Sequence, residues 1–184
     1  MSNRAIVLGG TDDHIKLIEL LKSKDYFVIL VDYYENPPAK NAADKHIQES
    51  TLDKEAVVKI AQEEEADLVI SACIDQALST ACFVSEKLGL PAPFTYETAL
   101  KVTNKVLMKE LMRKNNILTA KHMSIEDSDI NRIEEHLKHF HLPLIVKPAD
   151  SNGSYGVRKV NSLTEAKKYI ISALDISRSK KAII

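Results

Sequence analysis

The chain has 184 residues, of which 45% are hydrophobic, and a formal net charge of −1 at pH 7. This apolar content is sufficient for a packed core, and the near-neutral charge gives no electrostatic footprint for nucleic acid or an anionic membrane surface. No apolar run reaches the length of a membrane span or of a signal-peptide core, so a cytoplasmic location is expected. The only cysteines, Cys73 and Cys82, are expected to be buried, unpaired thiols.

Short apolar runs and helical patterns alternate in the N-terminal part of the chain. Strands are expected at 4–8, 27–32 and 68–71, and helices at 12–24, 53–65 and 75–88. This alternation predicts a parallel sheet with right-handed crossovers. Such a sheet opens a ligand crevice at the carboxyl ends of its strands. The residues that fall there are Gly9, Gly10, Asp32, Cys73 and Asp75.

The turn after the first strand gives a weak indication of a dinucleotide site. It supplies only part of the Gly-x-Gly-x-x-Gly pattern, although Asp32 lies at about the spacing of a ribose ligand. Asp12 and Asp13 would place negative charge where a pyrophosphate requires positive potential. They are better explained as an N-cap and first-turn acids of the following helix. NAD binding is therefore a disfavoured alternative.

A boundary is expected where a helix must end and two prolines follow, in the segment 88–93. The expected domains are residues 1–92 and 93–184. The second begins with a capped helix, in which Asn104 precedes Lys105 and apolar residues recur at helical spacing up to about Asn115. A lysine in the first turn is unfavourable to the helix dipole, which suggests a bound anion nearby. Taken alone, Lys105 would be better explained as a solvated lysine on a basic helix face.

The most informative segment is 143–157, where Lys147 ends an apolar strand and a glycine-rich turn follows. Pro148 stops the strand, so the ammonium projects where the sheet ends. Small residues and glycines allow backbone N–H groups to approach phosphate oxygens. The lysine precedes the glycines, which excludes a Walker A loop and predicts a strand-loop-strand flap. An ordinary hairpin with a solvated lysine is the alternative. A strand at 157–160, a helix at 164–176 and the start of another strand at 182 follow.

The order of these features resembles the ATP-grasp superfamily, and most closely the branch of the carbamoyl-phosphate synthetase large subunit, biotin carboxylase and the purine-pathway ligases. The resemblance implies an α/β fold, with a Rossmann-like pre-ATP-grasp sheet followed by the small α/β lobe of an ATP-grasp domain. Lys105 and Lys147 match the family's two ATP lysines. The flexible loop that closes over the triphosphate matches Ser151, Asn152, Gly153, Ser154, Tyr155, Gly156 and Val157.

The resemblance also implies a reaction, in which ATP phosphorylates a carboxylate and a nucleophile, most often nitrogen, attacks the acyl phosphate. The acceptor side is expected at Gly9, Gly10, Thr11, Asp32, Asp75 and Gln76, although a simple helix cap explains Asp75-Gln76 equally well. The family's Mg²⁺ ligands are expected beyond residue 184, so the chain alone is expected to be inactive. ATP and a small carboxylate are the expected partners, and a homodimer is a candidate assembly.

Two further alternatives concern the class of protein and a second metal site. A non-catalytic nucleotide-binding module, or a subunit completed by another polypeptide, would share the same phosphate residues. His136, His139 and His141 cluster near Pro143, but no His-Glu-x-x-His pattern or cysteine accompanies them. A solvated helix face is the favoured explanation of these histidines.

Overall fold

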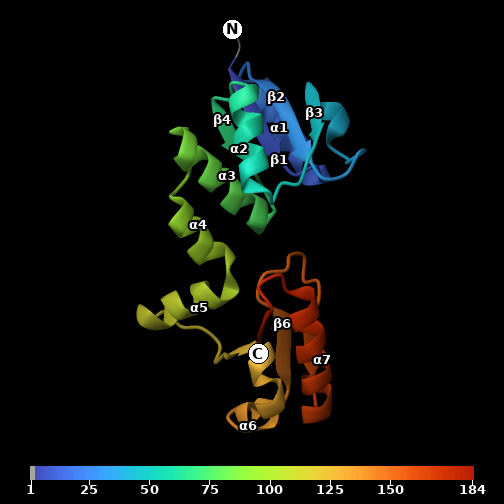
Figure 1. Cartoon of the computed structure of the whole chain (residues 1–184), viewed down its shortest axis with the longest axis vertical. Coiled ribbons are helices and arrows are strands. Elements are labelled where there is room, and N and C mark those ends of the chain that lie inside the picture. Colours follow the sequence, from blue (N-terminus) through green and yellow to red (C-terminus); the bar gives the residue numbers. More distant parts are fainter. Residues whose placement is uncertain (1–2) are drawn as a thin grey trace. The chain divides into compact units, whose positions relative to one another are not determined.

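The computed structural model describes residues 3–184, which divide between Leu100 and Lys101 into two compact units (Figure 1). The first unit is an α/β sandwich around a parallel sheet with strand order β3-β2-β1-β4. Its strands are β1 (Arg4–Leu8), β2 (Phe27–Asp32), β3 (Lys45–Gln48) and β4 (Leu68–Ile70). Its helices are α1 (Asp12–Lys22), α2 (Lys54–Glu63), α3 (Asp75–Leu88) and α4 (Tyr96–Thr103, which crosses the division), with a 3-10 turn at Lys40–Ala42.

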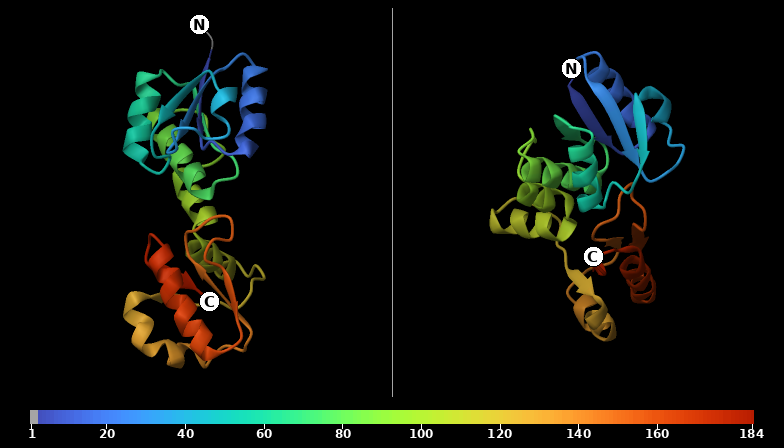
Figure 2. Two further views of the ribbon diagram at one scale, coloured as in Figure 1. Left: turned by 90° about the vertical axis from the view of Figure 1, so that its right-hand side faces the viewer. Right: turned by 45° about the horizontal axis from the view of Figure 1, so that its top comes forward.

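The sheet of this unit has a hydrophobic core on each face, because successive side chains of a strand point in opposite directions. Ile6 and Leu8 of β1 pack in the core that α2 and α3 cover, whereas Ala5 and Val7 pack in the core on the α1 side. Figure 2 shows α1 on one face and α2 on the other. Burial on both faces explains why β1 and β2 read as continuous apolar runs.

The parallel α/β fold predicted from the sequence is confirmed, with three differences in detail. Strand β3 was not predicted, because its side chains Lys-His-Ile-Gln are partly or fully exposed and form no apolar run. The N-cap of α1 is Thr11, so Asp12 and Asp13 both belong to the first turn. Cys82 is buried as expected, but Cys73 is exposed, because it lies in the loop after β4 with a φ of 62°.

The second unit is built on an antiparallel sheet with strand order β5-β8-β6-β7. Its strands are β5 (Ser124–Glu126), β6 (Leu144–Pro148), β7 (Arg158–Val160) and β8 (Lys181–Ile183). Its helices are α5 (Lys105–Lys114), α6 (Ile133–Leu137) and α7 (Leu163–Ile176), with a 3-10 turn at Asp127–Arg132. Helix α7 contributes Ala166, Ile170, Ala173 and Leu174 to the core that covers this sheet.

The predicted strand-loop-strand arrangement is confirmed, since β6 pairs antiparallel with β7, with Val146 opposite Arg158. The predicted last strand is also present as β8. Of the clustered histidines, only His136 lies in α6. In residues 3–184, His, Cys, Asp and Glu side chains form no group of three or more that could hold a metal ion.

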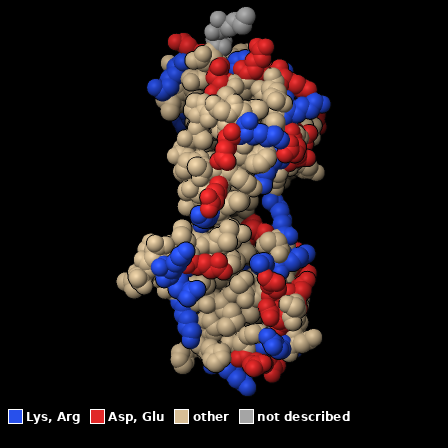
Figure 3. All heavy atoms as spheres, turned by 60° about the vertical axis from the view of Figure 1, so that its left-hand side comes forward, with Lys and Arg blue, Asp and Glu red and all other residues tan. Residues whose placement is uncertain are grey.

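None of the helices described is both long and apolar enough to cross a lipid bilayer. On the face drawn in Figure 3, basic and acidic side chains are interspersed.

Candidate functional site

Strand β6 places Lys147 at the end of the antiparallel sheet. The strand is fixed by buried Leu144 and Val146, and Lys147 lies opposite Ile183 of β8. The side chain is half-buried, and this burial, together with the positive charges of Lys109 and Lys105, lowers the pKa of Lys147 below its ordinary value. Like charges repel one another more strongly where water is partly excluded. A bound anion would therefore relieve the repulsion among these three ammonium groups.

Helix α5 supplies the other two lysines of this cluster. Its N-cap Asn104 accepts hydrogen bonds from the N–H groups of Val106 (3.0 Å) and Leu107 (3.3 Å), so the helix begins at Lys105. The Lys105 amine donates to the Ser151 carbonyl at 2.9 Å. The amine of Lys109 donates to Thr119 Oγ1 at 2.7 Å. We refer to Lys105, Lys109 and Lys147 as the lysine cluster.

Lys109 was not predicted from the sequence as part of the site. The signal was available, because residues four apart in a helix lie on the same face, and Lys109 is four residues after Lys105. The structure therefore brings together the two predicted lysines and adds a third positive charge. Lys147 is half-buried among other cations, whereas an ordinary hairpin would leave this lysine solvated.

The glycine-rich loop consists of two successive tight turns. In the first, Tyr155 N–H donates to the Asn152 carbonyl at 2.9 Å, and both central residues, Gly153 and Ser154, have positive φ (54° and 57°). This is the pattern of a type I′ turn. In the second, Val157 N–H donates to the Ser154 carbonyl at 3.1 Å, and Gly156 has a φ of 77°. The two turns give the loop a defined backbone path.

The base of the loop is held by a carboxylate and a glycine. Asp150 accepts hydrogen bonds from Ser177 Oγ (2.8 Å) and from the N–H groups of Ser179 (2.8 Å) and Arg178 (3.2 Å). At Gly156, an added Cβ would lie 2.8 Å from Pro148 Cγ. The loop therefore leaves the sheet from a packed, hydrogen-bonded base, whereas Gly153, Ser154 and Tyr155 are exposed.

In the first unit, the predicted residues around Gly10 form a hydrogen-bonded turn. The Gly10 N–H donates to Asp32 Oδ2 at 2.7 Å, and Tyr34 N–H donates to Asp32 Oδ1 at 2.8 Å. A Cβ on Gly10 would lie only 2.5 Å from Pro37 Cβ, so the 37–39 loop packs closely against this turn. Asp32 thus has a structural role in which both carboxylate oxygens hold backbone N–H groups.

The other predicted residues of this unit also lie at the carboxyl ends of neighbouring strands. Gly9 follows β1 with a φ of 104°, and a Cβ there would lie 3.0 Å from the buried His14 ring. Thr11 Oγ1 is 2.8 Å from His14 Nδ1. Asp75 is the exposed first residue of α3, ahead of the half-buried Gln76. The N-cap position belongs to Ile74, so the alternative explanation of Asp75-Gln76 as a simple helix cap does not hold for Asp75.

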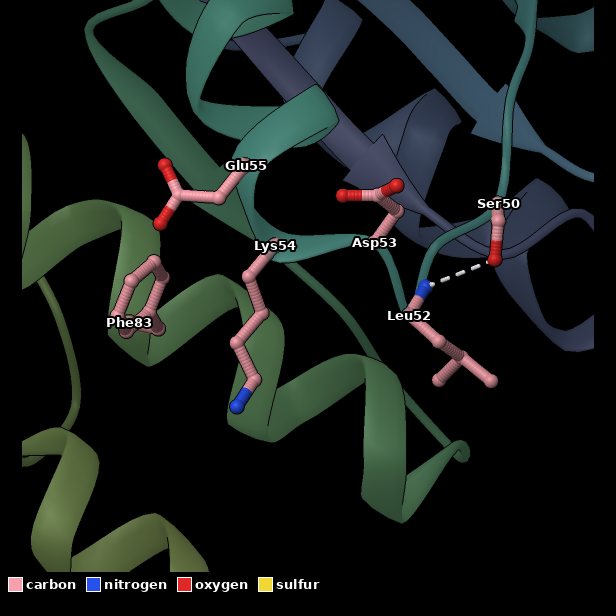
Figure 4. Close-up of a pocket in the computed structure, with 6 residues that line it drawn as sticks. All are labelled: Ser50, Leu52, Asp53, Lys54, Glu55 and Phe83. Atoms are coloured by element: carbon pink, nitrogen blue, oxygen red, sulfur yellow. Dashed lines mark hydrogen bonds between the residues drawn. The ribbon is translucent and has the colours of Figure 1, made fainter. Parts of the chain in front are cut away.

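An open cavity of about 700 Å³ also lies in the first unit, at the start of α2 (Figure 4). Its lining residues are Ser50, Leu52, Asp53, Lys54, Glu55 and Phe83. The Lys54 amine lies 4.7 Å from the Tyr96 ring centroid and 5.5 Å from that of Phe83, and Glu55 pairs with Lys87 at 2.6 Å. These contacts join α2, α3 and α4, so we interpret the cluster as packing that stabilises the unit. None of the predicted site residues lines this cavity.

The chain is similar to known proteins in both sequence and structure. The family model for the D-ala D-ala ligase C-terminus matches residues 111–184. A formate-dependent phosphoribosylglycinamide formyltransferase from Mannheimia succiniciproducens is 24% identical over 171 residues, covering 89% of this chain and 41% of that protein. The protein of the same name from Methanocaldococcus jannaschii is 29% identical over 142 residues, covering 76% of this chain and 36% of that protein.

Among solved structures, an N5-carboxyaminoimidazole synthetase from Staphylococcus aureus, complexed with ADP, has a TM-score of 0.77 at 18% identity. The match covers 98% of this chain and 46% of that one. The chain spans about two fifths of the length of the curated relatives it matches. Together, these findings confirm the resemblance to ATP-grasp ligases and the fold that the resemblance implies.

Proposed function

We propose that this chain is the part of an ATP-dependent ATP-grasp ligase that holds the phosphates of ATP, and that the whole ligase activates a carboxylate as an acyl phosphate. The observation that carries the proposal is the lysine cluster, in which three cations meet beside a glycine-rich loop at the end of β6. The solved structure complexed with ADP and the relatives named for their dependence on formate, a carboxylate, agree with it.

The proposed roles follow from the charges and donors of these side chains. Lys147 and Lys105 neutralise phosphate oxygens, and preorganised cations stabilise the charge that develops during phosphoryl transfer. The loop of residues 151–157 covers the triphosphate and excludes water. When bound, Mg²⁺ would neutralise further negative charge on the phosphates. Within residues 3–184, His, Cys, Asp and Glu side chains form no group of three or more that could hold this metal.

The acceptor-substrate side is proposed for the carboxyl ends of β1, β2 and β4. The hydrogen-bonded turn there consists of Gly9, Gly10, Thr11 and Asp32. Both carboxylate oxygens of Asp32 already accept backbone N–H groups, so we propose that Asp32 shapes the site and does not contact the substrate. Asp75 is exposed at the first residue of α3, and we propose that it contacts the acceptor together with Gln76. We propose that the full enzyme is cytoplasmic. We also propose that it forms a homodimer, which light scattering would test.

The phosphate site can be tested by titrating the chain, and the full-length ligase, with ATP and Mg²⁺ in a calorimeter. Lys147→Met should weaken binding by roughly ten- to a hundredfold, because a charge-assisted contact is worth about 1.5–3 kcal/mol. Lys147→Arg should recover it only in part, since the guanidinium is larger and planar. Lys114→Met, which removes an exposed lysine at the end of α5, is the matched control.

The expected order of effects is Lys147 first, because the sheet holds it beside the loop, and then Lys105. Unchanged affinity in Lys147→Met would remove Lys147 from the site and most of the proposal with it. The reaction itself is tested by ADP release from the full-length ligase, which should depend on formate or another small carboxylate.

A further inference from the structure

Lys105 makes two contacts with the chain that leaves β6. Its amine donates to the Ser151 carbonyl at 2.9 Å, and its backbone N–H donates to the Ala149 carbonyl at 3.4 Å. Ser151 is the first residue of the glycine-rich loop, and its own hydroxyl donates to the Tyr155 carbonyl at 2.7 Å. The first residue of α5 is therefore joined directly to the start of the loop.

The contact with Ser151 leaves Lys105 able to bind an anion. A lysine amine has three N–H donors and no acceptor, so one bond to a carbonyl leaves two donors for phosphate oxygens. A neutral carbonyl also leaves the positive charge in place. One side chain can thus hold the loop and a phosphate at the same time.

Lys109 lies on the same face of α5 but is held by a different segment. Its amine donates to Thr119 Oγ1 at 2.7 Å and to the Ala120 carbonyl at 3.4 Å, both in the stretch that follows α5. Like Lys105, it is half-buried and acts through its charge on Lys147. The two lysines therefore match in charge and helix position and differ in what they hold.

We infer that Lys105 is a positioning residue for the glycine-rich loop, which it holds beside Lys147 through the Ser151 carbonyl. The inference rests on the proposed function only in naming the phosphate as the second partner of the amine. It predicts that removal of the Lys105 amine loosens the loop in the free protein. Removal of Lys109 leaves the loop unchanged.

The test is amide hydrogen exchange, measured without nucleotide, at the two loop amides that donate within the turns, Tyr155 and Val157. Lys105→Met should make both exchange about tenfold faster, because a charge-assisted hydrogen bond at the loop start is lost. Lys109→Met should change them by less than about twofold. Lys105→Arg, which keeps a donor and the charge, should restore most of the protection, and Lys105→Gln serves as a second variant if the Met variant does not fold.

Unchanged loop exchange in Lys105→Met and Lys105→Gln would overturn the inference. Equal acceleration in the Lys105 and Lys109 variants would also overturn it, because it would indicate a general loss of α5. ATP titration of the same variants separates this result from the proposed function. Loop exchange that responds to Lys105 in a chain that does not bind ATP would support the positioning role and contradict the nucleotide site.

Discussion

Asp150 and Ser177, which are far apart in the sequence, are joined by a hydrogen bond of 2.8 Å between the carboxylate and the Ser177 hydroxyl. Ser177 is 1% exposed, and its hydroxyl also accepts the N–H of Lys181 at 3.2 Å. This contact connects the residue just before the glycine-rich loop to the turn between α7 and β8. The loop that we propose to cover ATP is therefore anchored in the core of its own unit.

The first prediction concerns the acid stability of this anchor. Burial alone would raise the pKa of Asp150, but the hydrogen bonds from Ser177, Ser179 and Arg178 outweigh it and lower the pKa. A carboxyl whose pKa is lower in the folded state stabilises the fold above its unfolded pKa, and this contribution is lost as the pH falls through the folded pKa. Asp150→Asn should reduce the free energy of unfolding at pH 7 by about 1 kcal/mol, the low end for a partly exposed group.

The measurement is urea unfolding, followed by circular dichroism, from pH 7 down to pH 3. The difference between wild type and Asp150→Asn should shrink toward zero at the acidic end. Glu134→Gln, at an exposed position of α6, is the control and should run parallel to wild type. A difference that stays constant with pH would show that the Asp150 carboxylate is not the source of the effect.

The second prediction concerns the pH dependence of anion binding. Burial and the charges of Lys109 and Lys105 lower the pKa of Lys147, so its ammonium loses the proton below the ordinary value of 10.5. Affinity for ATP or inorganic tripolyphosphate should therefore fall as the pH rises, beginning below that value. Lys109→Met removes one of the repelling charges, so it should move the midpoint of this fall to higher pH even though it weakens binding overall.

Calorimetric titrations at a series of pH values up to 10.5, all at the same ionic strength, would measure the midpoints for wild type and for Lys109→Met. Lys114→Met should leave the midpoint where it is in wild type. If Lys109→Met moved the midpoint to lower pH, the charge of Lys109 would not be what lowers the pKa of Lys147.

The third prediction compares two glycines of the same loop. An alanine Cβ at Gly156 would meet Pro148 Cγ at 2.8 Å and Ile176 Cδ1 at 3.0 Å, whereas no atom lies within 4 Å of a Cβ at Gly153. Both positions have positive φ, so both substitutions carry backbone strain of about 1 kcal/mol. Gly156→Ala adds a steric clash and should lower the free energy of unfolding by about 2–3 kcal/mol. Equal losses in the two variants would contradict the close packing at Gly156.

The sequence was sufficient for the features that local chemistry determines. Apolar runs predict β1 and β2, and the Lys147-Pro148 step with its glycines predicts the flap between β6 and β7. Lys109 was not predicted as part of the site: its place four residues after Lys105 was visible in the sequence, but its effect on Lys147 depends on the tertiary structure. The same holds for the bonds from Asp150 to Ser177 and from Lys105 to Ser151, since no sequence pattern specifies which distant backbone group a side chain will meet.

His14 illustrates the same limit in the first unit and provides the last prediction. Its ring is fully buried beneath Gly9, with Nδ1 2.8 Å from Thr11 Oγ1, although in the sequence it is only one of the six histidines. Burial lowers the pKa of His14 below 6.5, against the opposing effects of the Ala72 and Thr11 backbone and of Asp13 and Asp32. The unfolded chain therefore binds this proton more readily than the folded one, and the first unit should lose stability as the pH falls below 6.5.

In His14→Leu this part of the pH dependence should disappear. It should persist in His141→Gln, which alters an exposed histidine. Urea unfolding of the three proteins between pH 7.5 and pH 5 would measure the slopes, and a slope for His14→Leu equal to that of wild type would show that His14 does not control the acid response.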